Sequence, residues 1–390
     1  MEAARRARHK LALTIVDAAR SMQNAGGANM RGCGRGIRRK GDRLWLAVAL
    51  VGALALACVS GASNEANASE DATQFYLLGS KGPLAGITPP PGTYATSIKY
   101  YYSGDATGSG ADGVVLDQIG NLTLEAEINV DAEVFLEVPI VQWIAPQKVL
   151  GGNFGLGLLL PIGWKEISAD IDALATLTID PIDIGGVPVF EGITLQRGRR
   201  FSFSDDTVNV GDPVPMATLG WHHGNFHWNV TGLLNVPIGA YDEDDIANIG
   251  FNRWIFDASA AATWLDPTIG LEASATAGFS FHSENPDTNY NTGTEFHVEF
   301  ALQQHFSEAF AVGLVGFHFE QVTGDSGLGA TLGPFRGRVT ALGPNINYNF
   351  QLGQLPVATS LRWYHDFNVR NRLEGDLGVL TATIPLGGGG

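Results

Sequence analysis

The sequence predicts an all-β protein, a closed antiparallel transmembrane β-barrel of about 12 strands. Three observations predict it: apolar and polar residues alternate over many segments, aromatic residues recur at segment ends, and connections are short and long in turn. After Ala68 no apolar run reaches the ~18 residues that indicate a spanning helix. The expected strands cover residues 92–103, 120–143, 151–168, 213–223, 226–240, 252–264, 269–283, 294–305, 309–321, 335–350, 355–367 and 375–386.

The clearest alternation runs from Leu122 to Ile140. Even positions are all apolar, whereas odd positions are mostly acidic or polar. A period of two places these two sets on opposite faces of one strand. The run is about twice the ~9–11 residues that a bilayer strand needs, so we expect it to project beyond the membrane.

Ionic residues on the polar faces of the expected strands are our candidates for lining the lumen. Charged side chains avoid lipid, and an interior of ~12 strands is wider than the ~8-strand case that side chains just fill. The alternative is a salt-bridged network that fills a narrow interior. The candidates are Lys99, Glu125, Glu127, Glu133, Asp257, Glu272, Glu295, His297, Glu299, Arg336, Arg338, Arg362 and Asp366.

Two pairs of aromatic residues are spaced as the two interfaces of a bilayer require. Phe154 shares a face with Trp164, and Trp254 shares a face with Trp264, with mostly apolar residues between each pair. Ten residues at ~3.3 Å, tilted by ~40°, span about 25 Å of height. We therefore predict an aromatic girdle. Alternation without such a girdle would also describe a soluble sandwich.

The longest expected connection is Ala169 to Asp212. Shorter turns and longer, more polar loops alternate along the rest of the chain, as the two ends of a barrel require. This connection contains many apolar residues, and three roles stay open for it: a plug that folds inward, an apolar gate, or a cap over the barrel.

The first 68 residues have the order of a secretory signal peptide. Basic residues from Arg31 to Lys40 precede an apolar run from Leu44 to Val59, and small residues follow as far as Ala68. The apolar run is shorter than the ~20 residues of a spanning helix. A lipid anchor at Cys58 is the alternative, although the small-residue box before this cysteine is out of register.

The expected domain organisation has four parts. Residues 1–68 are a leader with a possible true start at Met30, and residues 69–91 are a periplasmic N-terminal segment. Residues 92–386 form the transmembrane barrel, and residues 387–390 are a glycine tail.

Charge and cysteine content exclude several classes of function. The net charge of the whole chain is −16. The leader holds 11 of 24 basic and 4 of 40 acidic residues, so 13 basic and 36 acidic residues follow it. This acidic balance disfavours nucleic-acid binding. Both cysteines lie in the leader, which excludes disulfides, thiolate metal sites and a cysteine nucleophile after cleavage.

Four short motifs were considered for chemistry. Gly324 to Gly327 spells part of a serine-nucleophile motif but indicates a turn. His282-Ser283 is a weak indication of an outer-membrane lipase, because no oriented base can be identified. Asp242 to Asp245 lacks the spacing of a calcium loop, and His222 and His223 point to opposite faces. We predict no catalytic residue, no metal site and no cofactor.

The entry to the first strand resembles a known family. Gly82-Pro83-Leu84-Ala85-Gly86 is followed by Pro89-Pro90-Pro91-Gly92-Thr93-Tyr94 and then by Tyr100-Tyr101-Tyr102. This stretch resembles the exported family named for the meta-pathway of phenol degradation. The resemblance implies an outer-membrane barrel that passes hydrophobic or aromatic compounds and carries no catalytic residues. The glycine tail departs from the apolar end usual in that family.

From these observations we expect a non-enzymatic channel or transporter for small hydrophobic or aromatic molecules in the outer membrane of a Gram-negative bacterium. Its partners would be the lipid bilayer, those small molecules and the barrel assembly machinery, without nucleic acid. The alternatives are a lipase-like barrel enzyme, a structural barrel with a closed lumen, and a soluble periplasmic β-protein.

Overall fold

The computed structural model describes residues 74–116, 120–184, 187–330 and 333–387, and all sixteen elements in these ranges are β-strands. The strands are β1 Gly92–Leu116, β2 Gly120–Val149, β3 Gly152–Leu159, β4 Ile162–Ile179, β5 Ile182–Ile184, β6 Val187–Phe190, β7 Ile193–Val210, β8 Val214–His223, β9 Phe226–Asn235, β10 Ile255–Asp266, β11 Leu271–His282, β12 Glu295–His305, β13 Phe310–Gln321, β14 Arg338–Leu352, β15 Leu355–Arg370 and β16 Glu374–Gly387.

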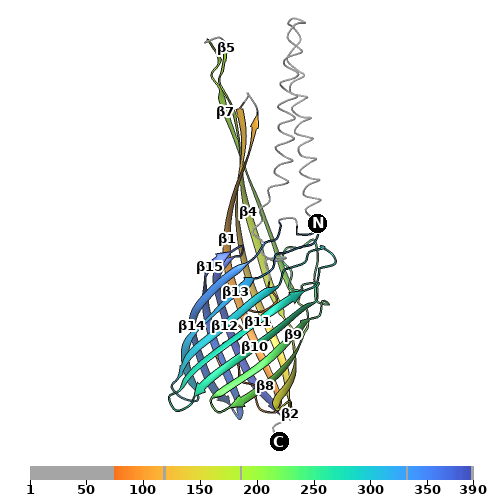
Figure 1. Cartoon of the computed structure of the whole chain (residues 1–390), viewed down its shortest axis with the longest axis vertical. Coiled ribbons are helices and arrows are strands. Elements are labelled where there is room, and N and C mark those ends of the chain that lie inside the picture. Colours follow the sequence, from red (N-terminus) through yellow and green to blue (C-terminus); the bar gives the residue numbers. More distant parts are fainter. Residues whose placement is uncertain (1–73, 117–119, 185–186, 331–332, 388–390) are drawn as a thin grey trace. The chain divides into compact units, whose positions relative to one another are not determined.

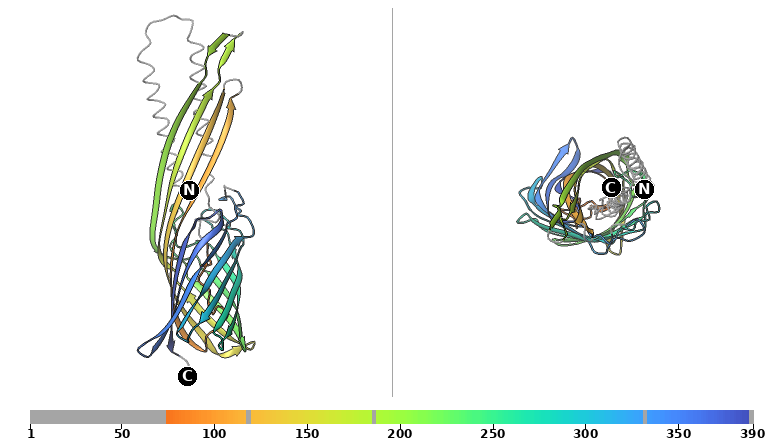
Figure 2. Two further views of the ribbon diagram at one scale, coloured as in Figure 1. Left: turned by 90° about the vertical axis from the view of Figure 1, so that its left-hand side faces the viewer. Right: turned by 90° about the horizontal axis from the view of Figure 1, so that it is seen from above.

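Twelve of these strands close into a barrel. The sheet has the order β1-β16-β15-β14-β13-β12-β11-β10-β9-β8-β3-β2-β4-β7, and an additional pairing of β1 with β2 closes the ring. Figure 1 shows the tilted strands of the wall side by side, and the right-hand view of Figure 2 looks along the lumen. β4 and β7 continue the sheet from β2 as two extra strands, so the predicted fold class is confirmed.

The alternating sequence accounts directly for the wall of the barrel. Along β10, Asp257, Ser259 and Thr263 are buried, whereas Phe256 and its even-numbered neighbours are exposed on the outer face. In the antiparallel ladder with β11, Thr263 lies opposite Ser274, so polar side chains of neighbouring strands meet on the inner face. A period of two thus separates an apolar outer face from a polar interior here.

The chain divides into two compact units. The described residues of the barrel unit are 74–108, 128–171 and 201–387, apart from the two undescribed positions near 331. The second unit contains described residues between 109 and 127 and between 172 and 200. Within it, β5 pairs with β6, and Arg200 Nε donates to Asp172 Oδ1 at 2.8 Å.

The stretch from Ala169 to Asp212 is not the loop that the sequence predicts. It contains the end of β4, the pair β5 and β6, and all of β7. The prediction failed because nearly every residue of β7 is exposed. A strand that buries neither face has no apolar side, so hydrophobic alternation cannot reveal it.

The first strand, β1, begins at Gly92 and the last, β16, ends at Gly387. The predicted leader, residues 1–68, and the glycines after Gly387 lie outside the described residues. In the described ranges, no helix has the length and apolar character needed to cross a membrane.

Candidate functional site

The residues that precede β1 lie inside the barrel and define the candidate site. We call residues 74–91 the lumen segment. Phe75, Tyr76 and Leu78 are buried, and the segment contacts inward-facing side chains of β9 to β12 and β15. The assignment of residues 69–91 to a periplasmic N-terminal segment stays a prediction. The polar inner wall satisfies part of the irregular backbone of the lumen segment.

The middle of the lumen segment is held by backbone hydrogen bonds to the wall. Leu84 N donates to Glu272 Oε1 at 2.6 Å, and Gly86 N donates to Thr263 Oγ1 at 2.9 Å. Asn229 Nδ2 donates to Ala85 O at 2.8 Å. A Cβ at Gly86 would lie 2.5 Å from Thr263 N, so only glycine allows this close approach.

The start of the segment is held at a second group of wall residues. Arg362 Nη1 donates to Ser80 O at 2.8 Å and to Lys81 O at 3.0 Å. The Tyr76 ring stacks on the His297 ring with centroids 3.5 Å apart. These contacts come from β12 and β15, so the segment bridges strands that are distant in sequence.

The wall behind the segment is a connected network of buried polar groups. Glu272 Oε1 also accepts from Ser274 Oγ at 2.7 Å, and Glu272 Oε2 lies 2.8 Å from His305 Nε2 and accepts a short hydrogen bond from Gln303. Asp257 Oδ2 lies 2.8 Å from His297 Nε2. Buried charges are stable only when they are paired or hydrogen-bonded, and this network meets that condition for Glu272 and Asp257.

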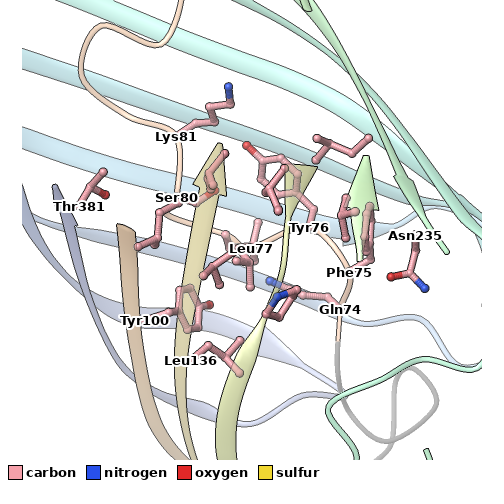
Figure 3. A pocket seen from close by; sticks show the side chains of 18 of the residues that line it. Gln74, Phe75, Tyr76, Leu77, Ser80, Lys81, Tyr100, Leu136, Asn235 and Thr381 are labelled. Carbon is pink, nitrogen blue, oxygen red and sulfur yellow. The ribbon is translucent and has the colours of Figure 1, made fainter. Parts of the chain in front are cut away.

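The other side of the lumen is apolar and encloses a cavity of about 370 Å³ (Figure 3). Its walls come from the lumen segment, from the inner faces of β1 and β2, and from apolar residues of β8, β9, β13, β14 and β16. The apolar residues include Phe75, Leu77, Leu78, Ile98, Tyr100, Leu136, Val138, Ile140, Val214, Leu233, Phe317, Val339 and Leu377. A concave apolar space with a few polar groups is the usual form of a small-molecule site.

Seven predicted lumen-lining residues are buried on the inner face of the wall. They are Asp257, Glu272, Glu295, His297, Glu299, Arg362 and Asp366. Of these, Asp366 lines the apolar cavity, and its Oδ2 accepts from Tyr102 at 3.2 Å. Their burial and the bonds of Glu272, Asp257 and Arg362 favour the alternative in which such residues form a hydrogen-bonded network.

Lys99 and Glu133 lie on the opposite face from the one we predicted. Both are exposed, whereas their neighbours Ile98 and Ala132 are buried and line the cavity. Alternation identifies two faces but does not say which one is inside. On β2 we took the acidic face for the interior, but β2 borders an apolar cavity and turns its apolar face inward. Lys99 forms an ion pair with Glu137.

Four further candidates are not part of the inner wall either. Glu125 and Glu127 are exposed and belong to the second unit. Arg336 is exposed in the connection before β14, and Arg338 is half-buried at the first position of that strand. We had extended the expected strand to residue 335, three residues before β14 begins.

The four candidate girdle residues lie on the exposed side of their strands. Trp254, directly before β10, is half exposed, and Trp264 near the other end of β10 is partly exposed. Phe154 on β3 and Trp164 on β4 are also partly exposed. Their assignment to membrane interfaces stays a prediction.

Several residues of the site were missed by the sequence analysis. Gln303 Oε1 accepts from Asn345 at 2.9 Å, and Thr263 and Asn229 hold the lumen segment. Each lies at an inward position of a strand in which apolar and polar residues alternate, so this alternation could have identified it. We selected only charged residues, and therefore overlooked neutral polar side chains.

Two of the motifs that resemble catalytic sequences make contacts with neighbouring residues in the structure. His282 lies 3.2 Å from buried Glu295, and Ser283 Oγ accepts from Trp254 N at 3.0 Å. Asp325 accepts from Tyr290 OH at 2.5 Å within the loops. In the described residues, no group of three or more His, Cys, Asp or Glu side chains is placed to hold a metal ion.

Comparisons with known proteins agree with the barrel. The sequence model of the family described as "Putative MetA-pathway of phenol degradation" matches residues 103–382. No curated protein matches the chain. An outer membrane channel from Pseudomonas putida F1 is 16% identical, with a TM-score of 0.51, over 77% of this chain and 98% of that one. A FadL homologue from Pseudomonas aeruginosa is 9% identical with a TM-score of 0.32, over 76% of this chain and 91% of that one.

Proposed function

This chain belongs to the family described as "Putative MetA-pathway of phenol degradation", and we propose that it is a channel for small hydrophobic or aromatic molecules. It acts in the outer membrane of a Gram-negative bacterium. The observation that carries the proposal is the apolar cavity of about 370 Å³ inside a closed barrel. A barrel that only filled its interior for stability would need no apolar space of this size.

The division of the lumen explains how such a channel can work. Polar residues of β9 to β12 and β15 hold the lumen segment through hydrogen bonds. The opposite side of the lumen offers aliphatic and aromatic side chains from β1 and β2. An apolar molecule therefore passes along the side that costs it little desolvation and avoids the side where it would disrupt buried hydrogen bonds.

The outer face of the wall suits contact with lipid. Phe256, Leu302 and Trp363 are about half exposed there and belong to three different strands. The bilayer is thus one partner, and small hydrophobic molecules are the other. The barrel assembly machinery inserts the chain after export, and the acidic balance disfavours nucleic acid as a partner.

The remaining sequence predictions belong to the same proposal. Residues 1–68 direct export as a cleaved leader, and the aromatic pairs at Phe154 and Trp254 mark interfaces of the bilayer. The proposal includes no enzymatic activity, and it is supported by the contacts of His282 with Glu295 and of Ser283 with Trp254.

Ile140→Trp tests this function, with Val141→Trp as its control. The two residues are adjacent on β2, but Ile140 lines the cavity and Val141 is 52% exposed on the outer face. Uptake of radiolabelled toluene is measured in whole cells whose outer membrane carries each variant and has no other such channel. The cavity-filling variant should lower uptake to near the level of cells without the protein, and the control should not. Equal uptake by both variants would refute the proposal.

A further inference from the structure

The apolar cavity carries a fixed hydrogen-bond acceptor at one end. Asn235 is the last residue of β9, is only 1% exposed and lines the cavity beside Phe75 (Figure 3). Among the described residues its Oδ1 atom has no hydrogen-bond donor. A buried acceptor without a donor is costly, which makes such an atom a candidate contact for a ligand.

The orientation of the Asn235 amide is determined by its other contacts. Asn235 Nδ2 donates to Asp212 Oδ2 at 2.8 Å and to Arg253 O at 3.0 Å. Both partners are acceptors, so the nitrogen must face them and the oxygen must face away. Rotating the amide would place oxygen against a carboxylate and a carbonyl.

Asp212 is itself held in place, so the acceptor is rigid. Its Oδ1 accepts from Gly239 N at 2.7 Å, and its Oδ2 also accepts from Phe251 N at 2.8 Å. Phe75, Val214 and Ile255 form a buried apolar cluster, and the cavity lining here also includes the polar residues Asp212 and Asn248. The Asn235 oxygen is thus fixed by two successive sets of hydrogen bonds and has no donor of its own.

We propose that Asn235 determines the specificity of the channel, by selecting neutral molecules whose apolar body carries a hydroxyl or N–H donor. The inference rests on the proposed function and narrows its substrate class. A donor on the ligand satisfies the Asn235 oxygen, whereas a hydrocarbon of the same shape leaves this oxygen buried without a partner. A site built to hydrogen-bond a donor rejects analogues that lack it.

Three probes of similar size test this selection in the unaltered protein. Phenol has a donor, anisole has only an acceptor, and toluene has neither. Dissociation constants are measured by calorimetry on the full chain in lipid nanodiscs, with empty nanodiscs subtracted. We expect phenol to bind about tenfold more tightly than anisole or toluene once partition into lipid is removed.

Variants assign the selection to Asn235. Asn235→Leu should reduce the ratio of phenol to toluene affinity to about one. Asn229→Leu is the matched control, because Asn229 lies on the same face of β9 but its Nδ2 donates to Ala85 O and its Oδ1 accepts from Thr231. That ratio should persist in the control even if both affinities change. A fast-migrating unboiled band on gels verifies that each barrel is folded.

The outcomes separate the two proposals. If the protein binds none of the probes, the channel function itself fails. If it binds all three equally, or if Asn235→Leu keeps the preference for phenol, the channel function stands and the role of Asn235 is overturned. The comparison of probes needs no variant, so misfolding of Asn235→Leu would not leave the proposal untested.

Discussion

At the residue scale, Glu272 joins the lumen segment to the polar network of the wall. Its two oxygens accept from Leu84 N, Ser274 and Gln303, and one of them contacts His305. Glu272→Ala should lower the free energy of unfolding by about 2–4 kcal/mol, because it leaves several buried donors without an acceptor. The temperature at which the fast-migrating gel band disappears measures this effect.

Glu133→Ala serves as the control for that prediction. Glu133 is exposed on β2, and the loss of an exposed carboxylate changes stability by only about 0.5 kcal/mol. An equal loss of thermal stability in both variants would contradict the assigned role of Glu272.

Gly86 tests how closely the lumen segment must approach the wall. A Cβ there would lie within 2.6 Å of backbone atoms of Thr263 and His227. Gly86→Ala should therefore displace the segment and raise single-channel conductance severalfold, since backbone atoms cannot move aside as side chains do. Gly108→Ala on β1 is the control, because a Cβ there would meet nothing within 4 Å. Unchanged conductance in Gly86→Ala would show that the segment does not restrict the pore.

Only some of the inward-facing residues could be predicted from the sequence. Alternation alone predicts the inward position of Asp257, Glu299 and Arg362, because the other face of each strand is clearly apolar. It does not predict the positions of Lys99 and Glu133, because an apolar face can turn either to lipid or to an apolar cavity. Hydropathy is the same in both cases, so only the closed structure distinguishes them.

At the element scale, strands that bury one face were predictable to within a few residues. The expected spans 269–283 and 309–321 became β11 Leu271–His282 and β13 Phe310–Gln321. β7 was missed because both of its faces are exposed. The position of the lumen segment inside the barrel could not be predicted, because it depends on hydrogen bonds to residues more than 100 positions away, such as Glu272.

The ion pair between β1 and β2, where the barrel closes, can be tested separately. Lys99 and Glu137 pair on the outer face, and Ser97 Oγ donates to Glu137 Oε1 at 2.5 Å. Lys99→Met and Glu137→Met should each destabilise the barrel, because each leaves a single charge facing the outside. The double variant should be less destabilised than the sum of the two by about 1 kcal/mol, measured by urea unfolding. Additive effects would show that the pair does not contribute to closure.

We expect the stability of the loop that contains Asp325 to depend on pH. Asp325 lies between β13 and β14, and burial raises the pKa of its carboxyl above the ordinary value, although Tyr290, Gly293 and Gln321 donate to it. Because the pKa is raised in the folded state, the stability of the folded loop decreases as pH rises from about 4 through the folded pKa, since the ionised carboxyl is then buried. Protection factors from amide exchange near Gly293 should fall over that window. Asp325→Asn should abolish the fall, and a fall that persists in it would exclude this carboxyl as the cause.

At the scale of the whole molecule, the barrel combines two interiors in one lumen. One side is a polar network that anchors the lumen segment, and the other is an apolar cavity. The closed barrel of about 12 strands was predictable from the alternation of apolar and polar residues and from the alternation of short turns with long loops. The cavity was not, because its walls combine residues of the lumen segment with both early and late strands.

The most direct test of this account is the position of a bound apolar molecule. Bromobenzene is soaked into crystals of the full chain, and anomalous scattering locates its bromine atom. We predict a bromine peak inside the cavity, near Phe75, Leu136 and Ile140. A bromine found only on the outer face of the barrel, at a concentration that supports uptake, would contradict the central claim that the lumen carries the substrate.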